Sequence, residues 1–194
     1  MAKLYFRYGA MGSSKSANAL MVKHNYEERG QSVLLVKPEM DQRDGEKIIY
    51  SRCGLSSPCE YFDVLWQRTV EQYQCIIVDE AQFLTKDEVM RLTEIVDVHH
   101  VPVIAYGLRA DFRGELFEGS AALLAHADSI EEVKTICWCG KKALYNTRIQ
   151  NGKVVKTGKQ IMLGADDLYI GLCRRHWKNG ALSPEQDEER GANE

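Results

Sequence analysis

The sequence has no long apolar run, and none of its stretches approaches the ~18 residues that a membrane-spanning helix requires, so no membrane partner is expected. It has no excess of basic residues, because 25 Lys and Arg stand against 28 Asp and Glu for a net charge of −3. A general nucleic-acid binder usually carries a basic face, so no nucleic-acid partner is expected either. The N-terminus also lacks the apolar segment of a signal peptide, which favours a soluble cytoplasmic protein.

Internal repeats are absent as well, and a length of 194 residues favours one to two domains. The hydrophobic fraction of 44% supports a substantial core. Of the six cysteines, three lie in the last third of the chain near a histidine, which indicates metal binding rather than disulfides, because cytosolic proteins rarely keep disulfides. Cys53 and Cys59 have no spacing that indicates a partner.

Apolar runs alternate with helical patterns as far as about residue 130, which predicts an α/β fold with a mostly parallel sheet and crossover helices. Residues 16–29 have a helical pattern closed by Gly30, and residues 85–88 form a capping box that opens a helix to about residue 97. Residues 38–60 hold charges, glycine and proline and are expected to form a long surface excursion. The expected strands are residues 4–8, 33–37, 75–79, 101–107 and 133–136.

The character of the chain changes after residue 136. Two short cysteine-containing pairs there flank a segment with Asn151-Gly152, a dipeptide typical of two-residue hairpin turns. We therefore expect a nucleotide-binding α/β domain over residues 1–136 and a small second domain over residues 137–180. Residues 181–194 are acidic and poor in apolar side chains, so this tail is expected to be disordered.

Residues 9–16 lie between an expected strand and an expected helix and resemble the phosphate-binding pattern G-x-x-x-x-G-K-[ST]. Such a loop (P-loop) directs backbone N–H groups and the positive end of a helix at phosphate oxygens. Lys15 would contact the β- and γ-phosphates of ATP, and the Ser16 hydroxyl would bind Mg²⁺. Ser14 replaces the second glycine of the pattern, and its Cβ restricts the backbone just before Lys15. The residues of the loop are Gly9, Ala10, Met11, Gly12, Ser13, Ser14, Lys15 and Ser16.

A second motif, residues 76–83, is an apolar strand that ends in Asp79-Glu80. A carboxylate just beyond a strand end lies in the crevice where α/β sheets bind ligands, so Asp79 would hold Mg²⁺. Glu80 would then be free to act as a general base toward an attacking hydroxyl. Each motif has a plainer alternative: the first would be an ordinary strand–turn–helix, and the second a strand that ends in solvated acids.

Cys137-x-Cys139 and Cys173-x-x-His176 supply thiol and imidazole ligands in two close pairs, which suit tetrahedral Zn²⁺. Since all positions around such an ion would be filled by protein, the zinc site would be structural rather than catalytic. The alternative is a set of free or redox-active thiols.

Residues 106–117 follow an apolar run and include two phenylalanines. Phe112 and Phe117, with Leu108 and Met11, would wall an apolar slot for a planar base near the phosphates. The alternative is that the phenylalanines belong to the core.

Together these motifs resemble those of thymidine kinases of the cellular, zinc-containing type (type II), in the bacterial branch of that family. The resemblance runs from Lys3 to about Lys178. It implies a P-loop NTPase (RecA-like) α/β fold with helices on both faces of the sheet, plus a small zinc-containing lasso domain. It rests on residues 9–16, Asp79-Glu80-Ala81-Gln82-Phe83, Gly107-Leu108-Arg109-x-Asp111-Phe112, the two zinc pairs and Gly164-x-x-x-x-Tyr169.

The resemblance also implies roles for individual residues. Glu80 matches the base that deprotonates the thymidine 5′-hydroxyl, and Gln82 falls in the ATP-binding motif that contains Asp79. Asp41 and Arg43 match a D-x-R element near the phosphates, in which Arg43 would stabilise transition-state charge. The residues expected to bind thymidine are Met11, Phe83, Leu108, Phe112, Phe117, Tyr169 and the lasso loop, whose backbone hydrogen bonds the thymine edge: Gln160, Ile161, Met162, Leu163 and Gly164.

The implied activity is transfer of the γ-phosphate of ATP to the 5′-hydroxyl of thymidine, with Mg²⁺ in catalysis and Zn²⁺ in structure. Deoxyuridine is an alternative substrate, because one methyl group is worth only ~1–3 kcal/mol in a pocket. The resemblance also implies a homotetramer and feedback inhibition by thymidine triphosphate (dTTP). The alternative function is a P-loop ATPase switch whose zinc module binds a protein or nucleic acid, and the acidic balance counts against it.

Overall fold

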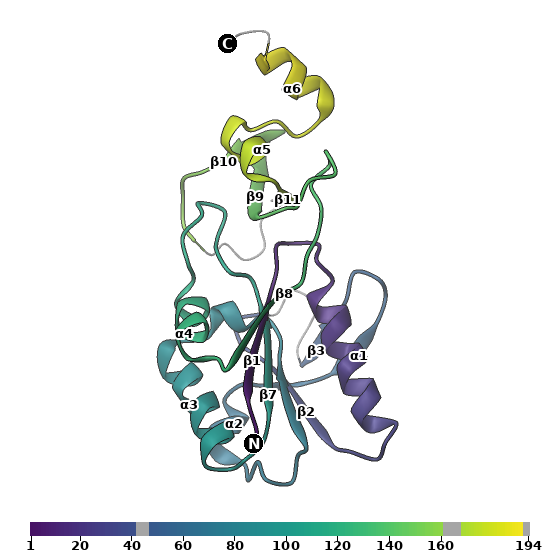
Figure 1. The fold of residues 1–194 in the computed structure, drawn as a ribbon, viewed down its shortest axis with the longest axis vertical. Coiled ribbons are helices and arrows are strands. Elements are labelled where there is room, and N and C mark those ends of the chain that lie inside the picture. The colour runs from purple at the N-terminus through teal and green to yellow at the C-terminus, as the bar shows by residue number, and fades with distance from the viewer. Residues whose placement is uncertain (42–46, 161–167, 192–194) are drawn as a thin grey trace.

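The computed structural model describes residues 1–41, 47–160 and 168–191. Its larger sheet has six strands, and every neighbouring pair in it is parallel. Figure 1 shows this sheet with helices on both faces, so the predicted α/β fold is confirmed. In spatial order its strands are β5 (Glu60–Tyr61), β2 (Val33–Lys37), β6 (Cys75–Val78), β7 (Val103–Gly107), β1 (Leu4–Tyr8) and β8 (Ser129–Glu132).

The centre of the sheet is apolar on both faces because helices cover both. All residues of β6 are buried, as its continuous apolar run predicts. Ile76 packs in the core beneath α3 (Lys86–Asp97) and α4 (Glu118–His126), whereas Ile77 packs in the core beneath α1 (Lys15–Glu27). Neighbouring residues of one strand therefore serve opposite cores, as the two-residue period of a strand requires.

The helix α3 begins at the predicted capping box. The Thr85 hydroxyl accepts a hydrogen bond from the Glu88 backbone N–H at 3.2 Å, and the Glu88 carboxylate accepts one from the Thr85 N–H at 2.7 Å. The helix α1 ends at Glu27, slightly earlier than predicted, and Gly30 follows with a φ of 71°. A short helix α2 (Val64–Gln67) and a 3₁₀ turn η1 (Ala81–Phe83) complete this part. Among the helices within the described ranges, none has the length and apolar content that a bilayer-spanning segment needs.

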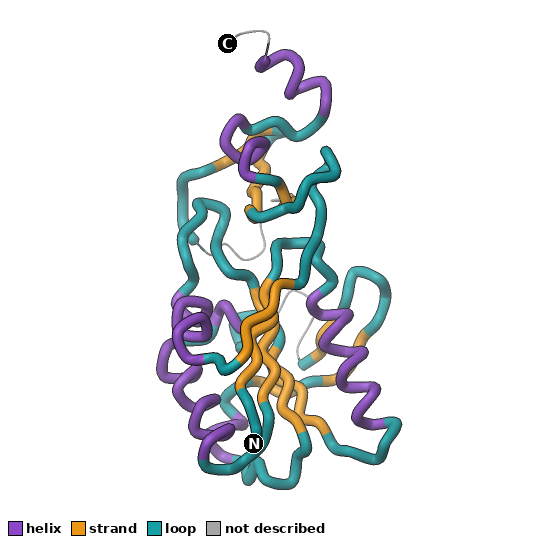
Figure 2. The backbone as a smooth tube through the Cα atoms, in the orientation of Figure 1, coloured by secondary structure: helices purple, strands orange, loops and turns teal. Residues whose placement is uncertain are grey.

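A second sheet, three-stranded and antiparallel, lies beyond the carboxyl ends of the parallel strands (Figure 2). Its predicted hairpin turn is confirmed, because Asn151 and Gly152 take φ angles of 50° and 70° between paired strands. The helix α5 (Arg174–Asn179) follows this sheet directly. In spatial order the strands are β10 (Lys153–Val155), β9 (Tyr145–Gln150) and β11 (Leu168–Leu172).

The expected strand at residues 133–136 is wrong. The sixth strand is β8 instead, and it pairs with β1 over residues Ser129–Glu132. The preceding Asp128 fixes this register, because its carboxylate accepts a hydrogen bond from the Leu4 backbone N–H at 2.7 Å. β8 is an edge strand with two adjacent glutamates, so it lacks the apolar run that marks the inner strands.

Residues 38–60, expected to form a surface excursion, contain strands in their described part. β3 (Ile48–Tyr50) and β4 (Ser56–Pro58) form an antiparallel pair, and β5 joins the main sheet beside β2. Ile49 explains why the segment folds, since its side chain is buried in the core beneath α1.

The tail also differs from its prediction as a disordered segment, because Pro184–Gly191 form the helix α6. Asp187 on this helix accepts hydrogen bonds from Arg175 and Asn179, both at 2.8 Å. Polar contacts to α5 therefore order the segment, and a composition poor in apolar residues does not reveal such contacts.

Candidate active site and metal cluster

In the loop between β1 and α1, Ser14 replaces the second glycine of the P-loop pattern, and its backbone is strained. Ser14 has a φ of 60° and a ψ of 30°, in the left-handed region that favours glycine. Its side chain makes no capping hydrogen bond within the described residues, which leaves the first N–H groups of α1 to a phosphate. Lys15 is buried, and its Nζ donates to the carbonyl oxygens of Gly9 and Ala10 at 3.0 and 3.1 Å.

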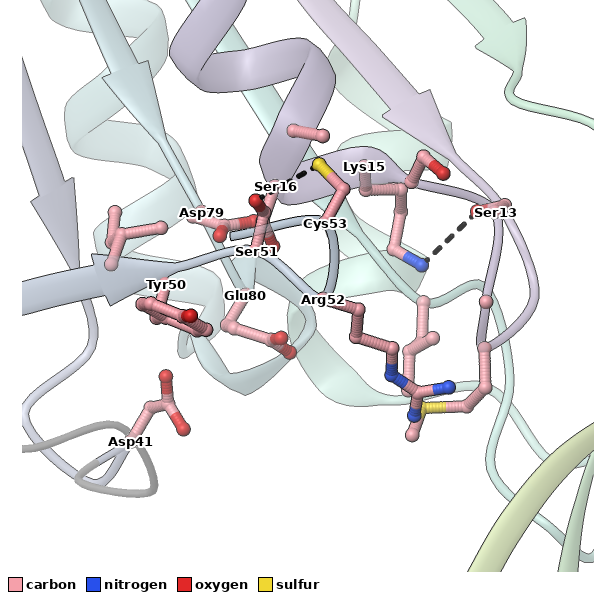
Figure 3. Close-up of a pocket in the computed structure, with 16 residues that line it drawn as sticks. Ser13, Lys15, Ser16, Asp41, Tyr50, Ser51, Arg52, Cys53, Asp79 and Glu80 are labelled. Carbon is pink, nitrogen blue, oxygen red and sulfur yellow. Dashed lines mark hydrogen bonds between the residues drawn. The ribbon is translucent and has the colours of Figure 1, made fainter. Parts of the chain in front are cut away.

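The carboxylate of Asp79 lies at the end of β6, against the start of α1. It is buried and lies beside the Ser16 side chain, so the two residues predicted to hold Mg²⁺ are neighbours (Figure 3). Burial, and then the charge of the adjacent Glu80, raise the pKa of Asp79 to about 7. A carboxylate beside a hydroxyl fits Mg²⁺, which prefers oxygen ligands.

Glu80 is held both by its backbone and by Gln82. Its φ of 51° is unusual for a residue with a side chain, and such strain is frequent at functional sites. The Gln82 side-chain amide donates to the Glu80 carboxylate, and its oxygen accepts from the Leu108 N–H at 2.9 Å. Gln82 is buried away from the cavity described below, so in this structure it connects Glu80 to the loop that follows β7.

The P-loop, the end of β6 and the β3–β4 turn surround one cavity of about 460 Å³, a size typical of ligand pockets. Figure 3 shows Lys15, Ser16, Asp79 and Glu80 around this cavity, with Ser16 next to Asp79. The two nucleotide-binding motifs predicted from the sequence therefore meet at one place. The predicted site residues that line the cavity are Met11, Gly12, Ser13, Ser14, Lys15, Ser16, Asp41, Asp79, Glu80 and Leu108.

The β3–β4 turn also lines the cavity, through residues that were not predicted from the sequence: Ser51, Arg52 and Cys53. Arg52 extends beside the P-loop, since its Nη1 lies 4.0 Å from the place that a Cβ would take on Gly12 (Figure 3). Within the described ranges, its guanidinium makes no hydrogen bond or ion pair. No sequence motif marks this turn. Its place at the cavity could have been predicted only by recognising that β3 and β4 form a hairpin.

The second sheet is tied to the P-loop through Asn146 of β9. Its side-chain oxygen accepts from the Met11 N–H at 2.7 Å, and its amide donates to the Ala110 carbonyl at 2.6 Å. Gln160 donates to the Asp111 carboxylate at 3.2 Å. The P-loop and the loop after β7 therefore both contact the second sheet.

The aromatic residues predicted to form a base slot pack near this loop. The Phe83 and Phe117 rings meet edge to face with centroids 5.8 Å apart. Phe112 is buried, and the Arg148 guanidinium lies 5.2 Å from its ring centre. Tyr169 lies opposite Arg148 on β11. The predictions for Arg43, Ile161, Met162, Leu163 and Gly164 fall outside the described residues.

The structure brings the predicted zinc ligands together. The ligand atoms of Cys137, Cys139, Cys173 and His176 all lie within 4.8 Å of one another. Leu172 is fully buried beside Cys137 and Cys173 and shields their thiols from water. Three thiols and one imidazole around a single point fit tetrahedral Zn²⁺, and a full set of protein ligands indicates a structural site.

The fold and the site together define an α/β protein of the phosphate-binding-loop class, with a carboxylate pair at the neighbouring strand end. A family model described as thymidine kinase matches residues 2–177. The chain therefore belongs to the thymidine kinase family.

Curated relatives agree with this assignment. The chain is 48% identical over 186 residues to a thymidine kinase of Novosphingobium aromaticivorans, which covers 91% of this chain and 97% of the relative. It is 47% identical to the thymidine kinase of Enterobacteria phage T4, with 91% and 96% covered. It is 41% identical to a thymidine kinase of Salmonella choleraesuis, with 98% and 99% covered. The predicted family is thereby confirmed.

Ser14→Gly should stabilise the protein, because it removes a Cβ from a left-handed backbone position that costs about 1–2 kcal/mol. Turnover should stay within about tenfold, a barrier change of about 1.4 kcal/mol. Thermal unfolding and steady-state kinase assays measure the two effects. His100→Gly is the matched control, since His100 also has a positive φ, of 56°, but lies in an exposed turn away from the site. Loss of all activity in Ser14→Gly alone would reveal a role for Ser14 beyond strain.

The raised pKa of Asp79 gives stability a defined dependence on pH. An unfolded aspartate has a pKa of about 3.9, whereas the pKa of Asp79 in the fold is about 7. Its protonation therefore favours the folded state, and this stabilisation is lost as the pH rises through 7. Without nucleotide, Asp79→Asn should raise Tm more at alkaline than at acidic pH.

Asp97→Asn is the control for this measurement, because Asp97 is an exposed carboxylate at the end of α3. It should shift Tm equally on both sides of neutrality. An equal shift for Asp79→Asn as well would contradict the raised pKa.

Proposed function

We propose that this protein transfers the γ-phosphate of ATP to the 5′-hydroxyl of thymidine, giving thymidine 5′-phosphate and ADP. The observation that carries the proposal is the single cavity at which Lys15, the Ser16–Asp79 pair and Glu80 meet. Membership of the thymidine kinase family supports a nucleoside as the acceptor. Phosphoryl transfer asks little covalent chemistry of a protein, so positioning and charge account for most of the catalysis.

In this mechanism the P-loop N–H groups and the start of α1 bind the phosphates of ATP. Lys15 exchanges its bonds to the loop carbonyls for bonds to the β- and γ-phosphates. Ser16 and Asp79 would hold Mg²⁺, and the ion would supply positive charge that offsets the charge of the phosphates. Glu80 takes the proton of the thymidine 5′-hydroxyl as that oxygen attacks in line, while Gln82 keeps the carboxylate oriented.

Thymidine would bind between the loop after β7 and the second sheet. Met11 and Leu108 line the cavity. Phe83, Phe112 and Phe117 do not line it, and Phe112 and Phe117 are buried, so their rings would have to pack against a base beyond the cavity. By the family resemblance, residues 160–164 would hydrogen bond the thymine edge through their backbone, and Tyr169 would reach the sugar 3′-hydroxyl. Deoxyuridine is the alternative substrate, since it lacks only one methyl group.

The same proposal includes several features that rest on the family resemblance. A nucleotide-binding domain would span residues 1–136, and a zinc-containing lasso domain residues 137–180. Arg43 would stabilise transition-state charge. The protein would be a cytoplasmic homotetramer with dTTP as feedback inhibitor.

Radiolabelled phosphate transfer from ATP–Mg²⁺ to a panel of nucleosides tests the proposal. Label should appear on thymidine, and Glu80→Gln should still bind thymidine but lose at least ~10²-fold in rate, because it lacks the general base. Glu94→Gln removes an exposed carboxylate on α3 and should keep its rate. ATP hydrolysis without transfer to any nucleoside would favour the ATPase switch instead. Near-normal turnover in Glu80→Gln would refute Glu80 as the base while leaving the activity in place.

Arg52 provides a separate test of the phosphate side. A hydrogen bond to a charged group contributes about 1.5–3 kcal/mol, so Arg52→Ala should lower kcat/KM for ATP about 10–100-fold while KM for thymidine changes little. Arg29→Ala is the control, because that guanidinium bonds only the Asn25 carbonyl on the surface of α1 among the described residues. An unchanged kcat/KM for ATP would show that Arg52 does not bind phosphate.

A further inference from the structure

His176 presents its two ring nitrogens to different partners. Its Nδ1 lies 3.4 Å from the Cys137 sulfur, inside the metal cluster. Its Nε2 lies 3.3 Å from Oδ2 of Asp187, on the C-terminal helix α6. The His176 side chain is only 3% exposed, so water does not compete for either nitrogen.

Trp138 fixes the plane of the same imidazole. The two rings stack with centroids 4.2 Å apart and an angle of 10° between their planes. The Trp138 Nε1 donates to the Ala181 carbonyl at 3.2 Å, which holds the indole in place. Stacking alone leaves open which ring edge faces the thiols. Nε2 is buried and makes no well-aligned hydrogen bond among the described residues, and the Asp187 carboxylate 3.3 Å away is a group that can accept its proton.

The Asp187 carboxylate is oriented before it meets the imidazole. Its Oδ1 accepts a hydrogen bond from Asn179 at 2.8 Å, and its Oδ2 accepts one from Arg175 at 2.8 Å. The side chain is 17% exposed, although it belongs to a segment rich in charged residues. An oriented, half-desolvated carboxylate against the outer nitrogen of a buried histidine is the usual partner of a metal-binding imidazole.

We propose that Asp187 is a positioning residue of the metal cluster, whose carboxylate accepts the Nε2–H of His176 and so presents Nδ1 to zinc. Such a bond fixes the tautomer of the imidazole and makes its other nitrogen a stronger ligand. The family match ends at residue 177, so this partner comes from beyond the matched part of the chain. The helix α6 is thereby a second layer of the zinc site rather than a solvated tail.

Zinc affinity of the full-length protein, measured by competition with a chromogenic chelator, tests the proposal. Asp187→Asn keeps the shape of the side chain but removes its charge, and it should raise the zinc dissociation constant about 10–100-fold. Glu188→Gln removes the same charge from the neighbouring, exposed residue and should change the constant by no more than about twofold. An unchanged zinc affinity in Asp187→Asn would overturn the proposal.

A double-mutant cycle separates positioning from simple docking of α6. In a His176→Cys background the fourth ligand has no second N–H, so Asp187→Asn should have no further effect on zinc affinity. Arg175→Gln removes another partner of Asp187 but leaves the imidazole contact, so it should retain zinc. An equal loss from Asp187→Asn in both backgrounds, or an equal loss in Arg175→Gln, would show that only the docking of α6 matters. Circular dichroism establishes that each variant is folded.

Discussion

The position of the Ser16 side chain beside the buried Asp79 carboxylate brings the two halves of the site together. This arrangement exists because β1 and β6 run parallel on either side of β7, which brings their carboxyl ends to one edge of the sheet. Burial strengthens the electrostatic interaction between such neighbours, since little water screens it. The β3–β4 turn and the loop after β7 contribute side chains to the pocket at that edge, and the second sheet bonds the P-loop through Asn146.

The sequence predicted those parts of the structure in which a local pattern has one outcome. The strands β1 and β2 have the predicted bounds, because each is a short apolar run with a turn at either end. The capping box at Thr85 and the Asn151-Gly152 turn are local geometry, and neither needs a distant partner. The zinc ligands were visible because metal coordination allows few spacings.

The parts of the structure that were not predicted depend on contacts between residues distant in sequence, which a single sequence does not reveal. The edge strand β8 is selected by the bond between Asp128 and Leu4, not by its own composition. Arg52 reaches the P-loop only because the β3–β4 pair folds back over α1. The order of α6 depends on Asp187 meeting α5, so the charges that suggested a disordered tail are the groups that anchor it.

Ser14 and Glu80 both line the pocket, and both have left-handed backbones although neither is glycine. Each conformation carries a folding cost that a glycine would relieve. A mutant library screened only for thermal stability would therefore be enriched in glycine substitutions at both positions. A glycine at position 14 would raise stability without loss of activity, whereas a glycine at position 80 would raise stability but remove the proposed base. Selection for thermal stability in this protein therefore has to be combined with an assay of kinase activity. Otherwise the most stable variants selected will include inactive proteins.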